Sequence, residues 1–577
     1  MITYIAISSP SAIDGDQILR MARRLIRFLP IEFSEEQPIV ISSNDSKSHF
    51  VYWLVEHPVG SAVHVEKEIV NVIQGYTTRI NHRDKSSVSS ALRDGDFIES
   101  PGGIYTLLTF NRQSGGFTGV QSKSGVTSLF FCKNKGLSIL SDRPVLAHMF
   151  SREEMEMDRG HIPSIIQSMF SINNTTPYVG TKKIPCSEFV SLRNGFLLKK
   201  QRKKFPPVVI GNEDKSRVED FQKILLESLP YGFSESNPTL RISGGKDSRL
   251  LLALFSYLKL DATIENQNLP FSSEGQIAHM AAAAAGYDLT LSAPVASNDV
   301  THSFLNGYVL RGGQLNPVPL HYPYENTIVK PRECLVLGHA HHPRGGFART
   351  MHAPLENVKK RLLDSFARPL VKPELDENSA IVLDYISNLK ADHPLHILYY
   401  AYSDLRVPNY LSIHYLEYQS RSIPVYPLVD ERVIIYLDSL ITAKEGSYQI
   451  VGETLFFSAI KGFSSELANL PLDNKRWRFE VSIPKPGFEE GFLERGRYPS
   501  HLPMSDWERS ARDHYLTRSR SAEKFVFQSV LSNLEFFEDF LNVDAIEAIR
   551  GGVMNKETMY ALYGIYMSYT LGRSVFG

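Results

Sequence analysis

The residues best suited to chemistry stand together in one loop, which reads Ser243-Gly244-Gly245-Lys246-Asp247-Ser248. Two glycines at the end of a strand let backbone N–H groups turn toward a bound oxyanion, and the start of the next helix favours negative charge. The serine hydroxyls add donors, and Asp247 is suited to hold the magnesium that accompanies a triphosphate. A bare Ser-Gly-Gly indicates only a tight turn, but the full loop is far more specific. The sequence therefore predicts a nucleotide-binding loop, although it is not a Walker loop, which needs GxxxxGK[ST].

A second glycine-rich segment, LGHAHHPRGGF (337–347), offers further candidates for nucleotide contacts. These are Gly338 and Arg344, because a guanidinium matches the geometry of a phosphate. The histidines of the segment raise zinc as an alternative. However, the adjacent His341 and His342 point apart in a strand, and no HExxH pattern or cysteine accompanies them. We expect a phosphate-facing or structural loop rather than a zinc site.

The elements around the first loop alternate between strand and helix. Helices are expected over 216–229, 247–259 and 274–285, and strands over 239–243, 261–268 and 334–339. This order predicts a right-handed α/β unit with a parallel sheet, whose strand ends carry the loop. From about residue 347 the pattern is mostly helical, including 522–577.

The first 205 residues have a different pattern, with short alternating runs separated by Gly, Ser, Asn and Lys. Strands are expected over 50–57, 104–110, 128–132 and 137–141, and a hairpin over 187–201 turns at Arg193-Asn194-Gly195. The basic segment KKQRKKFPPVV (199–209) then indicates a solvated linker. We therefore expect two domains, one β-rich over 1–205 and one α/β over 215–577.

The composition excludes several classes of protein. The chain has 577 residues, 62 Lys and Arg against 63 Asp and Glu, and only three, widely spaced cysteines. A balanced charge gives no reason to expect a nucleic-acid partner or an anionic membrane surface, and the cysteines exclude a disulfide framework. The N-terminus lacks the pattern of a signal peptide, and no apolar run reaches the ~18 residues needed to span a bilayer. We expect a soluble cytoplasmic protein.

SGGKDS resembles the pyrophosphate-binding loop of the ATP-pyrophosphatases, and its surroundings resemble the asparagine synthetase family. Residues 120–150 and 184–197 are similar to the glutaminase domain of that family. SIPVYPLVDERVIIYLDSL (422–440) is similar to its VPFLDxxLVEFAxxLP motif, which matches Asp430 to the family's aspartate. The resemblance spans most of the chain. It implies a glutaminase-like (Ntn-type) sandwich followed by a doubly wound ATP-pyrophosphatase domain with a helical C-terminal part.

Two departures from the family change what the resemblance implies. The family's glutaminases use a cysteine directly after the initiator Met, whereas this chain has Ile2 and its first cysteine is Cys132. Without a thiol at that position no nucleophile can form, so we expect a degenerate domain without glutaminase activity. In addition, 337–347 stands where the family has SGEGADELFGGY. The acid that would share magnesium with Asp247 is lost. Either a histidine of the segment contacts phosphate instead, or an acidic side chain comes from elsewhere in the chain.

The resemblance implies a reaction in two steps. A carboxylate attacks the α-phosphorus of ATP and releases pyrophosphate, and an amine then displaces AMP to form an amide. Lys475 stands near the family's lysine that stabilises the developing charge, with Arg478 as its rival. Glu417, flanked by two tyrosines, is a candidate base by similarity to the β-lactam synthetases. Alternatively, Lys475 is a surface lysine beside a buried tryptophan, and Glu417 is an ordinary glutamate on a helix surface.

Within the family the chain is most similar to the lasso peptide cyclases, which are macrolactam synthetases. That resemblance implies ATP and magnesium as cofactors and a precursor peptide whose N-terminal amine joins an Asp or Glu side chain. A leader peptidase and a precursor-recognition protein would be partners. The alternatives are a β-lactam-synthetase-like ligase and a ligase that uses ammonia or a small amine. The lost acids of 337–347 motivate an alternative of another class, a non-catalytic nucleotide-binding scaffold.

Overall fold

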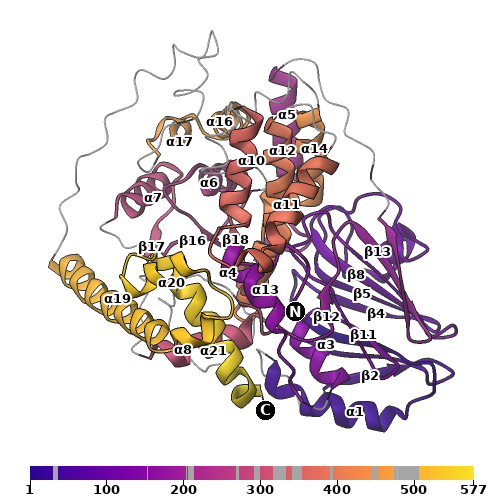
Figure 1. Cartoon of the computed structure of the whole chain (residues 1–577). Helices are drawn as coiled ribbons and strands as arrows, with labels where there is room; N and C mark the ends of the chain where they lie inside the picture. The colour runs from indigo at the N-terminus through magenta and orange to yellow at the C-terminus, as the bar shows by residue number, and fades with distance from the viewer. Residues whose placement is uncertain are drawn as a thin grey trace.

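A computed structural model describes residues 1–29, 37–152, 154–202, 205, 214–267, 272–291, 299–315, 333–340, 354–389, 394–442, 453–472, 477 and 506–576. The structural statements that follow concern these residues. The described chain is a mixed α/β structure, with antiparallel sheets in its first part, a parallel sheet in the middle and helices toward the C-terminus (Figure 1).

Two six-stranded sheets form the N-terminal part, and every described strand pair within them is antiparallel. The first has the order β12-β10-β11-β1-β3-β2, with β12 Thr181–Lys183, β10 Phe130–Asn134, β11 Leu137–Ser141, β1 Ile2–Ser8, β3 Ser48–Leu54 and β2 Ile39–Ser42. The second has the order β14-β13-β9-β8-β5-β4, with β14 Phe196–Gln201, β13 Glu188–Arg193, β9 Gly116–Gln121, β8 Ile104–Asn111, β5 Ile69–Tyr76 and β4 Ala62–Val65.

The central strand β1 explains how these sheets pack. Side chains alternate along a strand, and every residue of β1 is buried, so both faces of the strand are covered. Ile2 and Tyr4 belong to the core that the two sheets share. Ile5 and Ile7 belong to a second core, which also holds side chains of the C-terminal helices.

The predicted hairpin is confirmed, but the predicted linker is partly wrong. β13 pairs with β14, and the turn Asn194-Gly195 has positive φ values of 51° and 76°, the conformation of a tight two-residue turn. Residues 199–201, the start of the basic segment, are the end of β14 and pair with β13. Exposed lysines on this edge strand gave the segment the composition of a linker.

A five-stranded sheet carries the predicted loop, and all its described strand pairs are parallel, as expected. Its order is β17-β16-β15-β18-β19, with β17 Leu289–Leu291, β16 Thr263–Asn266, β15 Thr239–Arg241, β18 Glu333–Leu337 and β19 Ser422–Val425. From β15 the chain adds β16 and β17 on one side, and then β18 and β19 on the other side, so the strand order reverses between β15 and β18. In such a sheet the crevice for a ligand lies beyond the carboxyl ends of the strands where the order reverses.

Helices pack around this sheet. One helix, α5 Asp214–Leu226, precedes the first strand of the sheet. The others are α6 Lys246–Leu258 and α7 Ser273–Ala284, which follow its strands, and α16 Thr454–Phe463 and α17 Ser465–Asn469 from later in the chain. Of these, α16 packs against α5 and α6, although some two hundred residues separate it from them in sequence. Further helices are α10 Leu355–Phe366, α11 Glu377–Asn388, α12 Pro394–Ala401, α13 Ser412–Gln419 and α14 Glu431–Thr442.

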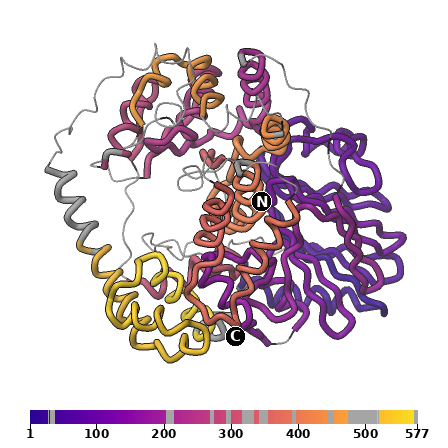
Figure 2. Tube along the Cα trace, turned by 45° about the horizontal axis from the view of Figure 1, so that its top comes forward, coloured from indigo at the N-terminus to yellow at the C-terminus, as the bar shows by residue number. Residues whose placement is uncertain are grey.

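The C-terminal helices pack beside the N-terminal part, far from it in sequence (Figure 2). They are α19 Asp506–Ser532, α20 Val543–Arg550 and α21 Lys556–Phe576, and α21 also contacts α8 Val300–Leu310 and α4 Ile162–Ser168. The predicted helical character of 522–577 is therefore confirmed by the end of α19 and by α20 and α21. Within the described part of the chain, no helix combines the length and apolar character required to cross a membrane.

Two adjacent carboxylates join the N-terminal part to the start of α14. Asp430 accepts hydrogen bonds from the Gly103 N–H (2.5 Å) and the Thr78 hydroxyl (3.0 Å), and Glu431 accepts one from the Arg202 guanidinium (2.6 Å). Both carboxylates are fully buried. Burial of a carboxylate is costly unless it is paired and hydrogen-bonded, so these contacts hold the two parts of the chain in one arrangement.

Candidate functional site

The predicted loop connects β15 to α6, at the carboxyl end of a central strand. Gly245 is the N-cap of α6, and because it has no side chain it cannot cap the first N–H groups of the helix. The hydroxyls of Ser243 and Ser248 lie 3.2 Å apart, and the Ser248 hydroxyl accepts a hydrogen bond from the Ser243 N–H (3.0 Å). Asp247 is buried in the first turn. This arrangement gathers donors and a positive helix end at one point.

Gly338, predicted as a nucleotide contact, lies directly against this loop. A Cβ atom on Gly338 would be 2.7 Å from the Ser248 nitrogen and 2.8 Å from its Cα atom, closer than real contacts allow. The end of β18 therefore approaches the start of α6 only because residue 338 has no side chain. His339 follows, and its ring centre lies 5.5 Å from that of the buried Tyr426.

Lys246 makes a contact that the sequence did not predict. Its ammonium pairs with the carboxylate of Glu453, which directly precedes α16. Glu453 has a φ of +65°, a left-handed conformation that few non-glycine residues adopt. No motif surrounds Glu453, and the pair joins residues 207 positions apart, so the sequence carried no signal for it.

Glu417 lies on α13 and faces a different cavity. Its carboxylate accepts a hydrogen bond from the Arg311 Nε–H (2.9 Å), and the His414 ring is 3.9 Å away. Burial lowers the pKa of His414 to about 4, so at neutral pH this ring is uncharged. The cavity has a volume of about 150 Å³ and is lined by Glu417 together with Arg241, Glu265 and Tyr418, among others. None of its lining residues belongs to the loop 243–248.

Several predicted residues lie outside the described residues. These are Arg344, Lys475 and Arg478, together with His341 and His342. Trp477 is described, and it is fully buried with its ring 5.3 Å from Phe457 of α16 in an edge-on contact. Among the residues that the structure describes, no three or more His, Cys, Asp or Glu side chains are grouped to hold a metal ion.

Asp430 has a different setting from the loop. It lies at the junction with the N-terminal part, where Gly103 and Thr78 donate to it. Burial raises its pKa to about 6, in spite of these hydrogen bonds. The structure therefore gives Asp430 an observed contact role between the two parts of the chain.

The N-terminal position at which asparagine synthetases carry their glutaminase nucleophile is occupied here by buried residues. Ile2 belongs to the core between the two N-terminal sheets, and Thr3 is fully buried with its hydroxyl donating to Asp142 (3.3 Å). Cys132 is buried on β10, where its sulfur contacts the Ser151 hydroxyl (3.2 Å). No exposed nucleophile is seen at these three positions.

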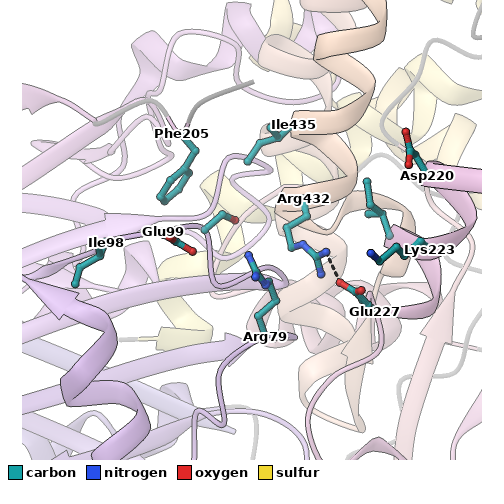
Figure 3. A pocket seen from close by; sticks show the side chains of 11 residues that line it. Arg79, Ile98, Glu99, Phe205, Asp220, Lys223, Glu227, Arg432 and Ile435 are labelled. Carbon is teal, nitrogen blue, oxygen red and sulfur yellow. Dashed lines mark hydrogen bonds and ion pairs between the residues drawn. The ribbon is translucent and has the colours of Figure 1, made fainter. Parts of the chain in front are cut away.

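A larger cavity, of about 730 Å³, lies where α5 and α14 meet the N-terminal part (Figure 3). Arg79, Lys223 and Arg432 line it, and three carboxylates balance their charge. The carboxylate of Glu227 pairs with Arg432. None of the residues that line this cavity was predicted from the sequence as a site residue, because they come from distant segments without a shared motif.

Comparison with known proteins gives little beyond this geometry. No family model matches the chain. No curated protein matches it either. Among solved structures it is similar to a glutamine phosphoribosylpyrophosphate (PRPP) amidotransferase from B. subtilis, solved in complex with ADP and GMP. The identity is 9%, the TM-score is 0.22, and the match covers 52% of this chain and 67% of that one. At this TM-score, function has to be argued from the chain's own residues.

Proposed function

We propose that this chain is an ATP-dependent, AMP-forming amide ligase. One observation carries the proposal, namely the loop 243–248 at the carboxyl end of β15, with Gly338 of the neighbouring strand end packed against it. The loop lies where the strand order reverses, which is where α/β sheets of this kind bind ligands. Its resemblance to the pyrophosphate-binding loop of the ATP-pyrophosphatases supplies the class of ligand.

The residues of the loop suit a magnesium-bound triphosphate. The N–H groups at the start of α6 and the hydroxyls of Ser243 and Ser248 would hold the β- and γ-phosphates. Asp247 offers the carboxylate oxygen that magnesium prefers, and the metal would shield phosphate charge. A carboxylate substrate would then attack the α-phosphorus and expel pyrophosphate, and an amine would displace AMP from the acyl group. Lys475 and Arg478 remain the candidates for stabilising the leaving phosphate. Glu417 faces a cavity that the loop does not line and is paired with Arg311, so it is the candidate base only for an amine that reaches the acyl group from that cavity.

The finer proposal is macrolactam closure of a lasso peptide. It rests on the sequence resemblance and on the buried Ile2 and Thr3, since a chain without a glutaminase nucleophile must take its amine from the substrate. The N-terminal amine of a precursor peptide would attack the activated side chain of an Asp or Glu. A leader peptidase would first free that amine, and a precursor-recognition protein would deliver the peptide.

The test is a reaction of the full chain with ATP, magnesium and a leader-free candidate peptide that carries an Asp or Glu, read by mass spectrometry and by AMP release. AMP together with a peptide lighter by one water would support macrolactam synthesis. AMP without a change in the peptide would favour a small carboxylate, as in the β-lactam-synthetase-like or small-amine alternative. Absence of AMP with any acid tested, in magnesium or manganese, would contradict the ligase and favour the scaffold. Asp247→Ala is the control, and it should abolish AMP formation.

A further inference from the structure

Lys246 is the one basic residue of the loop 243–248, and it stands at a place where a cation is disfavoured. It is the first residue of α6, and the N-terminus of a helix carries partial positive charge that repels an ammonium group. The Glu453 carboxylate offsets this repulsion by pairing with it. An anion at this point is therefore favoured by both the helix and the lysine, and here a side chain supplies it.

Both partners are largely shielded from solvent, so water and salt screen their attraction only weakly. The side chains of Lys246 and Glu453 are 14% and 5% exposed. A carboxylate this deeply buried is costly unless it is paired and hydrogen-bonded, and Lys246 supplies a counter-charge to Glu453. α16, which begins directly after Glu453, packs against α6 and so holds Glu453 beside the loop.

We propose that Glu453 competes with bound phosphate for Lys246 and so limits how tightly the loop holds pyrophosphate. This inference rests on the proposed function of the loop. A phosphate at the start of α6 offers the same negative charge as Glu453 and would draw the lysine toward itself. The free energy of the Lys246–Glu453 pair is then lost on binding and regained on release.

Such competition has a use in a reaction that produces pyrophosphate. A loop that bound the product as tightly as its donors allow would release it slowly, whereas catalysis requires that product leave. Glu453 reclaims Lys246 as pyrophosphate leaves, which favours release. The left-handed backbone of Glu453 indicates a residue held in place for its side chain, since a non-glycine residue adopts this conformation only at a cost.

The experiment measures binding of magnesium pyrophosphate and of magnesium ATP to the full chain by titration calorimetry. Glu453→Gln keeps the shape of the side chain and removes its charge. We expect it to lower the Kd for pyrophosphate by about fivefold or more. Glu453→Asp keeps the charge and should stay within about twofold of the wild type. Glu227→Gln removes a paired carboxylate in the 730 Å³ cavity, away from the loop residues, and serves as the matched control.

Lys246 provides the second half of the test. In a double-mutant cycle, Glu453→Gln should tighten binding in the presence of Lys246 and have no effect on a Lys246→Gln background. If Glu453→Gln alone fails to fold, the comparison of Lys246→Gln with the double variant still tests the inference. The two should bind pyrophosphate equally, and tighter binding by the double variant would show that Glu453 acts without Lys246 and would overturn the inference. Unchanged or weaker binding by Glu453→Gln would overturn the inference and leave the ligase standing. A wild type that binds neither pyrophosphate nor ATP would overturn both.

Discussion

At the residue scale, the absence of a side chain at position 338 is the most directly testable feature of the site. Gly338→Ala would place a methyl group 2.7 Å from the Ser248 nitrogen, and backbone atoms on both sides leave little room to adjust. We expect the start of α6 to shift, so that ATP affinity falls about tenfold or more while the unfolding free energy falls by about 1–3 kcal/mol. Calorimetric titration and urea denaturation measure the two effects.

A glycine elsewhere gives the control for this substitution. Gly15 begins α1 Gly15–Arg24, and a Cβ atom there would meet only the Ser42 hydroxyl at 3.7 Å, an ordinary contact distance. Gly15→Ala should leave both ATP affinity and stability nearly unchanged. Unchanged ATP affinity in a folded Gly338→Ala chain would contradict the role given to the close contact between Gly338 and Ser248.

Residues of the site could be predicted from the sequence where neighbouring residues form a motif. They could not be predicted where their role depends on a partner far away in the sequence. The loop 243–248 and Gly338 carry their meaning in adjacent glycines and a strand before them. Glu453 has no such context, and its partner Lys246 is 207 positions away. The sequence singled out Glu417, but its ion pair with Arg311 spans 106 positions and had no pattern to indicate it.

At the scale of elements, Lys183 of β12 is bound to a π-helix, η5 Tyr402–Leu411. Its ammonium donates to the Pro408 carbonyl (2.5 Å), the Asn409 side chain (3.2 Å) and the Ser412 hydroxyl (3.1 Å). Burial lowers the pKa of Lys183 to about 7. The strand thus supplies a donor to carbonyl and side-chain oxygens at the end of the wide helix.

This lowered pKa predicts a specific pH dependence. Between about pH 7 and pH 10 the unfolded chain holds a proton on Lys183 that the folded chain has released, so this residue makes stability rise with pH. In Lys183→Met that contribution is absent. The unfolding free energy of the wild type relative to the variant should therefore rise by about 1.4 kcal/mol per pH unit between pH 8 and 10. Urea denaturation at pH 8, 9 and 10 measures it, and a difference independent of pH would contradict it.

Elements with a clear period were predicted well, and those defined by tertiary contacts were not. The alternating runs of the first part and the helices around the loop have periods of two and 3.6 residues, which the sequence displays directly. The π-helix was not predicted, since Pro408 within it reads as a helix end and its oxygens are bound by a residue of β12. The sequence predicts a linker at the end of β14 because the exposed residues there are basic.

At the scale of the whole molecule, the Arg202–Glu431 pair tests how firmly the two parts are joined. Both side chains are almost fully buried, and Glu431 also accepts from the Tyr105 hydroxyl (2.9 Å). Arg202→Met leaves a buried carboxylate without its cation, so we expect a loss of about 3–5 kcal/mol in unfolding free energy. Arg550→Met breaks an exposed pair with Glu538 and should cost less than about 1 kcal/mol. Equal effects of the two variants would contradict this prediction.

The buried titratable groups of the molecule predict that it loses stability in mild acid. Burial lowers the pKa of His82, His148 and His414 to about 4 and of His161 to about 3, and it raises the pKa of Asp142 and Asp430 to about 6. Near pH 5 the unfolded chain protonates all four histidines, whereas the folded chain protonates only the two aspartates. These six groups therefore give the unfolded chain about two more protons, and the stability that they contribute should fall by about 2.7 kcal/mol per pH unit as the pH drops from 6 to 5. The Met1 amino group, whose pKa burial lowers to about 5, makes the fall steeper. His161→Gln should reduce this slope by about 1.4 kcal/mol per pH unit, because it removes one histidine that protonates only on unfolding. Urea denaturation at pH 6.0, 5.5 and 5.0 measures both slopes, and a chain that gains stability over this range would show that the aspartates outweigh the histidines.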